Sequence, residues 1–315
     1  MKNTRDILAA IPLPDVLGVA EPQQNLISVQ NKGWELAINW KDNIGKLDYS
    51  FRLNLSDVNN KITDLASVTP VIGDQVRMVG QPIDAFYGLV ADRISQASDY
   101  DYNPATKVYT PKFPTLVADR NFLAPGDIIY KDLSGPDGKP DGVITLDNDR
   151  QVIGNPYPRY TYGFRGTANY KGFDFAFFLQ GVLKSNGYIL GPARHAFINE
   201  STNPQKVHLD RWTPENRGGS YPRLTYQQSH NQRFSSFWLE DGAYLRLKNI
   251  QLGYTLPTSL TTRLRIQRLR FYASADNLLT VTNFFYAYDP ETPLTNGGLY
   301  PQLKIFTFGV NVNFR

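Results

Sequence analysis

An acidic segment between positions 126 and 154 carries the side chains of this chain that are best suited to binding an ion. Calcium loops offer carboxylate oxygens at alternate positions, with a glycine at the sharp bend and an apolar residue after it, and residues 141–144 (Asp-Gly-Val-Ile) fit the centre of such a loop. The candidate calcium ligands are Asp132, Asp137, Asp141 and Asp149. Residues 135–140 look like an insertion into the EF-hand pattern, and no Glu closes the loop. A solvated acidic turn in a loop is therefore the competing interpretation.

Catalytic chemistry finds little support in the sequence. The histidines, His195, His208 and His230, fall in one long polar segment without a flanking carboxylate motif, so we interpret them as surface loop residues. Glu240 and Asp241 are adjacent, so in a strand their side chains point to opposite faces and cannot form a glycosidase pair. The chain has no cysteine and no Gly-x-Ser-x-Gly, Walker or dinucleotide-binding glycine motif. We therefore predict that the protein is not an enzyme and needs no cofactor, apart from the calcium considered above.

Aromatic residues make up 13% of the chain, with 19 Tyr and 18 Phe. Several of them, in the same polar segment as the histidines, could stack on sugars, but we favour roles as loop anchors or interface residues: Trp212, Tyr221, Tyr226, Phe237 and Trp238. Tyr-rich composition suits membrane interfaces, where the ring lies in the apolar zone and its hydroxyl in water. The net charge of +4 is spread without a basic stripe, which predicts no nucleic-acid partner.

The elements that must position these residues are β-strands with a strict period of two. Between Leu47 and Leu55 every odd position is apolar and every even position is polar, over nine residues. That length is near the ~9–11 residues that a tilted strand needs to cross a bilayer. Residues 34–40 alternate in the same way, and the turn residues at 42–45 predict a hairpin between the two strands.

Further strands follow toward the C-terminus. Residues 160–170 and 173–179 form a predicted hairpin around the short turn Lys171-Gly172. In the next predicted pair, residues 243–256 and 269–279, the apolar phase of the first strand slips, so we expect a β-bulge near Lys248-Asn249. The last strand runs from Ile305 to Phe314.

The connections between these strands alternate in length. Short turns alternate with the long segments Lys184 to Glu240 and Thr280 to Gln302, as short periplasmic turns and long extracellular loops do in outer-membrane barrels. Ile83 to Arg93 reads as one further strand, and Ser95 to Ala124 as loop. With about eight strands, the predicted fold is all-β: part of a transmembrane antiparallel barrel with long extracellular loops. The charged N-terminus, residues 1–6, has no apolar stretch after it and does not resemble a signal peptide.

Ordered sequence blocks resemble the SusC/RagA-like TonB-linked outer-membrane transporters. The most specific block is residues 244–257, YLRLKNIQLGYTLP. The others, in family order, are residues 4–8, Leu13-Pro14, residues 31–35 (NKGWE), 126–128, 141–144, 149–150, 153–156, 275–278, 288–291 (YDPE) and 306–312 (FTFGVNV). One departure is Arg315, which follows the aromatic residue that ends such chains. The resemblance covers the whole chain, residues 1–315.

This resemblance implies a barrel of about 22 strands plugged by an N-terminal domain. It implies import of a glycan or peptide across the outer membrane of a Bacteroidetes-like Gram-negative bacterium, with a SusD-like surface lipoprotein as lid and the TonB–ExbB–ExbD complex as energy source. The chain matches only the C-terminal barrel portion, so we expect a truncated or split reading frame without plug, signal peptide or TonB box. We expect this portion alone to import nothing.

A secreted, soluble β-rich glycan-binding module is the alternative. The two interpretations differ in what covers the apolar face of the last strand: lipid in a barrel, a second sheet in a module. In the barrel interpretation the strand Ile305 to Phe314 lacks its closing partner and presents an open edge.

Overall fold

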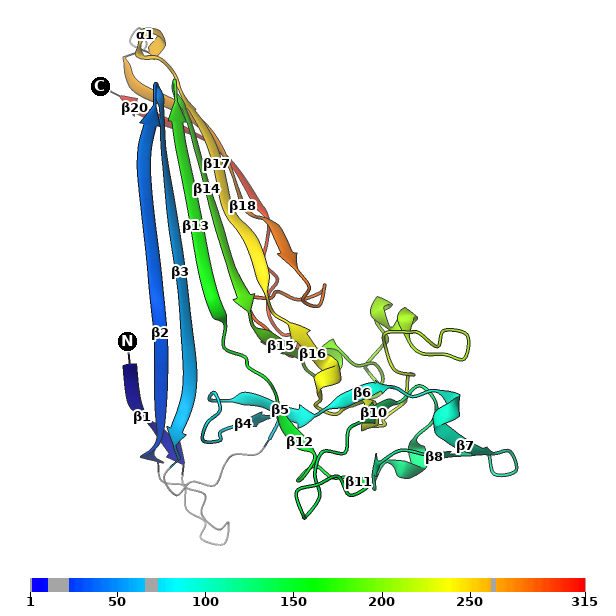
Figure 1. The fold of residues 1–315 in the computed structure, drawn as a ribbon. Helices are drawn as coiled ribbons and strands as arrows, with labels where there is room; N and C mark the ends of the chain where they lie inside the picture. Colours follow the sequence, from blue (N-terminus) through cyan, green and yellow to red (C-terminus); the bar gives the residue numbers. More distant parts are fainter. Residues whose placement is uncertain (1, 11–22, 66–72, 262–264, 315) are drawn as a thin grey trace.

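A computed structural model describes residues 2–10, 23–65, 73–261 and 265–314. Eight strands form one antiparallel sheet in the order β1-β2-β3-β13-β14-β17-β18-β20, which Figure 1 shows as a tall curved wall. Their bounds are Lys2–Ala10 (β1), Gln23–Ile44 (β2), Leu47–Asp64 (β3), Arg159–Tyr170 (β13), Phe173–Lys184 (β14), Tyr244–Thr255 (β17), Ile266–Thr282 (β18) and Ile305–Phe314 (β20). The predicted all-β fold is confirmed, and β1 and β20 are the two open edges of the described sheet.

Short turns join the strands at the end of the wall drawn uppermost in Figure 1. Lys171 and Gly172 both have positive φ, 46° and 89°, as a two-residue type I′ hairpin turn requires. The first hairpin turns at Gly45-Lys46, since β2 and β3 stay paired up to Ile44 and Leu47. The prediction of a turn at residues 42–45 was therefore wrong in position. Gly45, with φ of 64°, supplies the left-handed conformation at the corner.

The predicted bulge in β17 is confirmed. Phe178 pairs with Asn249 and Leu179 with Leu247, so Lys248 is the extra residue. Because the bulge absorbs one residue, the apolar side chains on both sides of it stay on the same face of the sheet. The one-residue phase slip in the sequence therefore marks a bulge, and this bulge lets β17 keep its apolar side chains on one face along its whole length.

The apolar face of the sheet has no cover in the described residues. Phe308 is 82% exposed and Phe306 62%, and Val310, Val312 and Phe314 of β20 are exposed on the same face. A second sheet packed on this face, as the soluble-module interpretation requires, is absent from the part of the chain that the structure describes. The geometry is that of a barrel wall rather than of a sandwich.

The long connections fold together at the opposite end of the wall (Figure 1). We call residues 73–158, 185–243 and 283–304 the loop body. Its strands form five small sheets and are Gln75–Val76 (β4), Ala85–Leu89 (β5), Ala91–Ile94 (β6), Tyr100–Asn103 (β7), Val108–Pro111 (β8), Thr115–Leu116 (β9), Ile128–Tyr130 (β10), Val143–Ile144 (β11), Arg150–Gly154 (β12), Asn186–Ile189 (β15), Leu239–Asp241 (β16) and Leu294–Thr295 (β19). Short helical turns lie at Ala97–Asp99, Arg120–Phe122, Gly191–Ala193, Lys206–Asp210, His230–Gln232 and Ser236–Trp238, and one four-residue helix, α1 (Thr258–Thr261), sits in the β17–β18 connection.

Two predictions fail in the loop body. Residues 83–93 do not form one strand of the wall: β5 and β6 belong to two different small sheets, and the eighth wall strand is β1. Residues 95–124 are not plain loop, since they contain β7, β8 and β9. The cause is burial within the loop body, whose hydrophobic core joins all three connections through residues such as Phe86, Tyr188 and Phe285. No helix in the described residues is long and apolar enough to span a membrane.

Candidate functional site: the polar face of the wall and its loop body

The face of the wall opposite the apolar one is a ladder of polar side chains. Ser50 and Thr167 share a hydrogen bond of 2.6 Å across β3 and β13, and Ser56 and Thr161 share another of 2.6 Å. Arg52 donates from Nε to Asn39 Oδ1 at 2.6 Å on the neighbouring pair. Alternation of an apolar face with such a polar face is typical of a barrel with a solvated interior.

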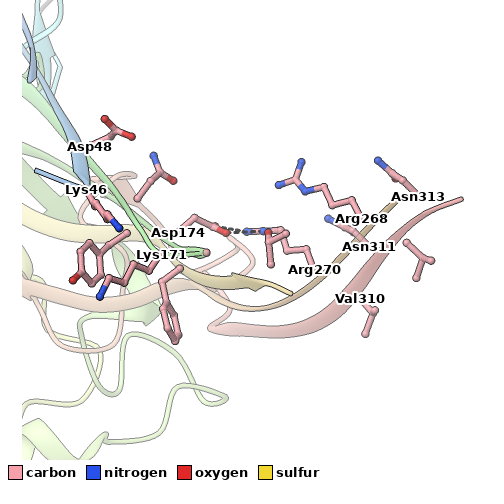
Figure 2. Close-up of a pocket in the computed structure, with 15 residues that line it drawn as sticks. Lys46, Asp48, Lys171, Asp174, Arg268, Arg270, Val310, Asn311 and Asn313 are labelled. Carbon is pink, nitrogen blue, oxygen red and sulfur yellow. Dashed lines mark hydrogen bonds and ion pairs between the residues drawn. The ribbon is translucent and has the colours of Figure 1, made fainter. Parts of the chain in front are cut away.

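A charged cavity of about 970 Å³ opens on this polar face near the short turns (Figure 2). The ion pair between Arg270 and Asp174 crosses it, with Nη2 to Oδ2 at 2.5 Å and Nε to Oδ1 at 2.8 Å. Lys46, Lys171 and Arg268 also line it and have no carboxylate within ion-pair distance among the described residues. The wall therefore presents unpaired positive charge to its interior at this end.

A buried arginine fastens the last connection to the wall at the other end. Arg246 on β17 donates from Nη2 to both carboxylate oxygens of Asp289 at 2.8 Å, and from Nε to Thr280 Oγ1 at 2.9 Å. Its Nη1 lies 3.0 Å from Glu291, which also pairs with Lys248 at 2.8 Å. We call this group the Arg246 latch. It gives a physical role to the two sequence blocks, residues 244–257 and 288–291, that carry the family resemblance.

The four candidate calcium ligands do not converge. Asp149 is fully buried, and its Oδ1 accepts backbone N–H bonds from residues 133 and 134 while its Oδ2 accepts one from residue 145. Asp132 accepts the N–H of Gly142 at 2.6 Å, Asp141 accepts the N–H of Val143, and Asp137 is exposed. No group of three or more possible metal ligands occurs among the described residues. The segment is a loop organised around Asp149, and calcium binding by it stays a prediction.

Asp127, which starts this acidic segment, is a structural anchor that sequence reasoning did not single out. Its carboxylate is buried and pairs with Arg223 through two hydrogen bonds of 2.7 and 2.9 Å. Asn231 donates to the same carboxylate at 2.7 Å. These partners lie about a hundred residues away, so no local pattern could reveal them.

The interpretation of the histidines as surface loop residues was wrong. His195, His208 and His230 are all buried in the loop body. Burial lowers the pKa of His195 to about 3, helped by the nearby Arg194 and His208, so its ring is neutral at pH 7. Burial also lowers the pKa of His208. The error arose because the long connections bury one another's polar residues rather than lying open in solvent.

Arg194 is the centre of an aromatic cluster that holds the loop body together. Its guanidinium carbon lies 4.5 Å from the ring centroid of Phe285, 5.1 Å from that of Trp238 and 5.4 Å from that of Tyr221. Its ion pair with Glu240 measures 2.5 Å. Burial raises the pKa of Tyr221 to about 12. Cation–π contacts offset part of the free-energy cost of burying the guanidinium of Arg194. Tyr221 and Trp238 therefore act as loop anchors, the role that we favoured for these aromatic residues from the sequence.

Known proteins are similar to this chain in sequence and in fold. The chain is 31% identical to TonB-dependent receptor P3 of Formosa agariphila, over 99% of this chain and 31% of that receptor. It is 24% identical to TonB-dependent receptor SusC of Bacteroides thetaiotaomicron, over 99% of this chain and 29% of the receptor. A solved structure described as the RagAB peptide transporter matches with a TM-score of 0.74 and 22% identity, over 99% of this chain and 32% of the matched chain. No family model matches the chain.

The sheet has one apolar and one polar face, with short turns at one end and long connections at the other. These features define a segment of a transmembrane β-barrel wall. The sequence matches are more specific: over 99% of its length the chain is similar to TonB-dependent receptors, SusC among them. It spans about a third of the length of the relatives it matches.

Proposed function

We propose that the chain forms part of the wall and the extracellular loops of an outer-membrane importer. The observation that carries this proposal is the two-faced sheet, because one face suits lipid and the other a solvated interior. Homology to TonB-dependent receptors over nearly the whole chain supports the same function. The wall itself is passive, and no step of chemistry is assigned to its residues.

The substrate would be a glycan or a peptide. One sequence relative is SusC, and the matching structure is described as a peptide transporter, so similarity supports both classes. We propose a SusD-like surface lipoprotein as lid, and energy from the TonB–ExbB–ExbD complex. The loop body is the part of the chain that would meet the lid and the incoming substrate, because it lies at the end of the wall opposite the short turns (Figure 1).

Uptake by the producing bacterium tests the proposal. Cells lacking the gene for the receptor that contains this chain, and cells carrying that gene without the codons for residues 283–304, are supplied with labelled oligosaccharides or labelled peptides. We expect uptake of one of the two classes in cells with the intact gene, and its loss in both altered strains and after a protonophore. Uptake of both classes that is unchanged by deletion of the gene would contradict the proposed function.

A further inference from the structure

His230 joins two connections of the loop body that are far apart in the sequence. It begins the helical turn His230–Gln232 in the β14–β17 connection. Its ring contacts Asp119 and Ile128, which both belong to the β3–β13 connection. The ring is buried, with 7% of the residue exposed, so water does not replace either contact.

Both ring nitrogens of His230 face groups that accept hydrogen bonds. Nδ1 lies 3.0 Å from Asp119 Oδ2, and Nε2 lies 2.8 Å from the carbonyl oxygen of Ile128. A backbone carbonyl oxygen cannot donate, and an ionised carboxylate cannot donate either. The two contacts are both favourable only if both nitrogens donate.

Asp119 is ionised in this arrangement. Arg233 donates from Nε to Oδ2 at 2.8 Å and from Nη2 to Oδ1 at 2.9 Å. Burial opposes ionisation, but the hydrogen bonds from His230 and Arg233 hold the pKa of Asp119 at about 2. The carboxylate thus accepts three donated hydrogen bonds and has no proton to give to the ring.

A neutral imidazole has one N–H, so it can serve only one of these two acceptors. We propose that His230 carries both ring protons in the folded loop body and acts as a proton-dependent pin between the two connections. Loss of one proton leaves a buried acceptor facing a lone pair, and the pin loosens.

The surroundings of His230 supply one negative charge and one other positive charge. Asp119 and Arg233 are the charged groups in contact, and the ring of Tyr130 lies 5.2 Å from the imidazole, between centroids. Tyr130 donates its hydroxyl to the carbonyl of His230 at 2.8 Å. The neighbouring Asn231 is neutral and accepts the N–H of Ile128 at 2.9 Å. Residues 230 and 231 therefore contact residues 127–130 through several hydrogen bonds.

His208 shows why this arrangement is specific to His230. Its Nδ1 lies 2.8 Å from the backbone N of Gln205, whose N–H it accepts, and 3.2 Å from the carbonyl oxygen of the same residue, while its Nε2 faces the carbonyl of Arg194 at 3.1 Å. One ring proton, on Nε2, serves the contact with Arg194 and leaves Nδ1 free to accept the shorter of its two contacts. His208 is therefore the internal control: it is buried and has contacts at both nitrogens, but a backbone N–H donates to its Nδ1.

Ring protonation can be measured directly in the unaltered protein. The protein in detergent micelles is labelled with ¹⁵N-histidine, and one-bond N–H couplings are recorded at pH 6.5, with signals assigned from the His208→Gln and His195→Gln variants. We expect two N–H couplings for His230 and one for His208. A single coupling for His230, with the amide of Ile128 still protected from exchange, overturns the proposal.

Asp119→Asn tests the same inference independently. Its side-chain amide can donate to Nδ1, so the ring of His230 then needs only the proton on Nε2. We expect one N–H coupling for His230 in this variant instead of two. Two couplings in the variant would contradict a pin that depends on the Asp119 carboxylate.

Discussion

At the scale of single residues, the Arg246 latch makes the sharpest energetic prediction. The side chain of Arg246 is 3% exposed and serves two carboxylates. Arg246→Ala leaves Asp289 without its arginine partner, whereas Glu291 keeps Lys248. Breaking such a buried pair costs about 3–5 kcal/mol. We expect a lower Tm in detergent and proteolysis within residues 283–304. Lys248→Ala is the control, because its side chain is 23% exposed and should cost at most about 1 kcal/mol.

The buried ring of His195 should make the folded state less stable in mild acid. Its folded pKa of about 3 lies below the ordinary value of 6.5, so the folded state binds fewer protons than the unfolded state between these values. Stability from this residue is therefore complete above pH 6.5 and is lost as the pH falls toward 3. We expect the Tm to drop between pH 6.5 and pH 4, and to drop less in His195→Gln. Equal drops in the two proteins would show that another group is responsible.

At the scale of elements, the strands could be predicted from sequence and the loop body could not. The alternation of apolar and polar residues located the strands β3, β13, β14, β17 and β20, and the phase slip located the bulge at Lys248. Both signals could be read from the sequence because each lies within a single strand. The loop body depends on pairs such as Asp119 with His230, 111 residues apart. A local pattern carries no information on such pairs, which is why three buried histidines were interpreted as exposed.

The bulge gives the prediction at this scale. Deleting Lys248 removes the extra residue and makes Leu247 and Asn249 neighbours, so pairing with β14 can continue without a bulge while the apolar side chains keep their face. We expect the deletion variant to assemble into membranes, measured as protease-resistant, heat-modifiable protein. Lys248→Ala keeps the bulge and should also assemble normally. Loss of assembly in the deletion variant alone would show that the bulge does more than absorb one residue.

At the scale of the whole molecule, the described sheet has two open edges, and β20 presents one of them along its full length. Unpaired N–H and C=O groups on an edge strand pair readily with another chain. We expect this chain alone to form oligomers or aggregates in detergent, measured by size-exclusion chromatography with light scattering, and to import nothing. A monodisperse monomer that needs no detergent would instead favour a soluble module.

The central claim is that the apolar face of the wall meets lipid. Trp34 and Trp40 lie on β2 in the same phase as the apolar residues of β3, and both are exposed, whereas Trp212 and Trp238 are buried in the loop body. The most direct test is quenching of tryptophan fluorescence by brominated phospholipids after reconstitution into vesicles. We predict that part of the fluorescence is quenched, and that this part disappears in the Trp34→Phe/Trp40→Phe double variant. Unquenched fluorescence in the reconstituted protein, or the same quenching in the double variant, would contradict the account.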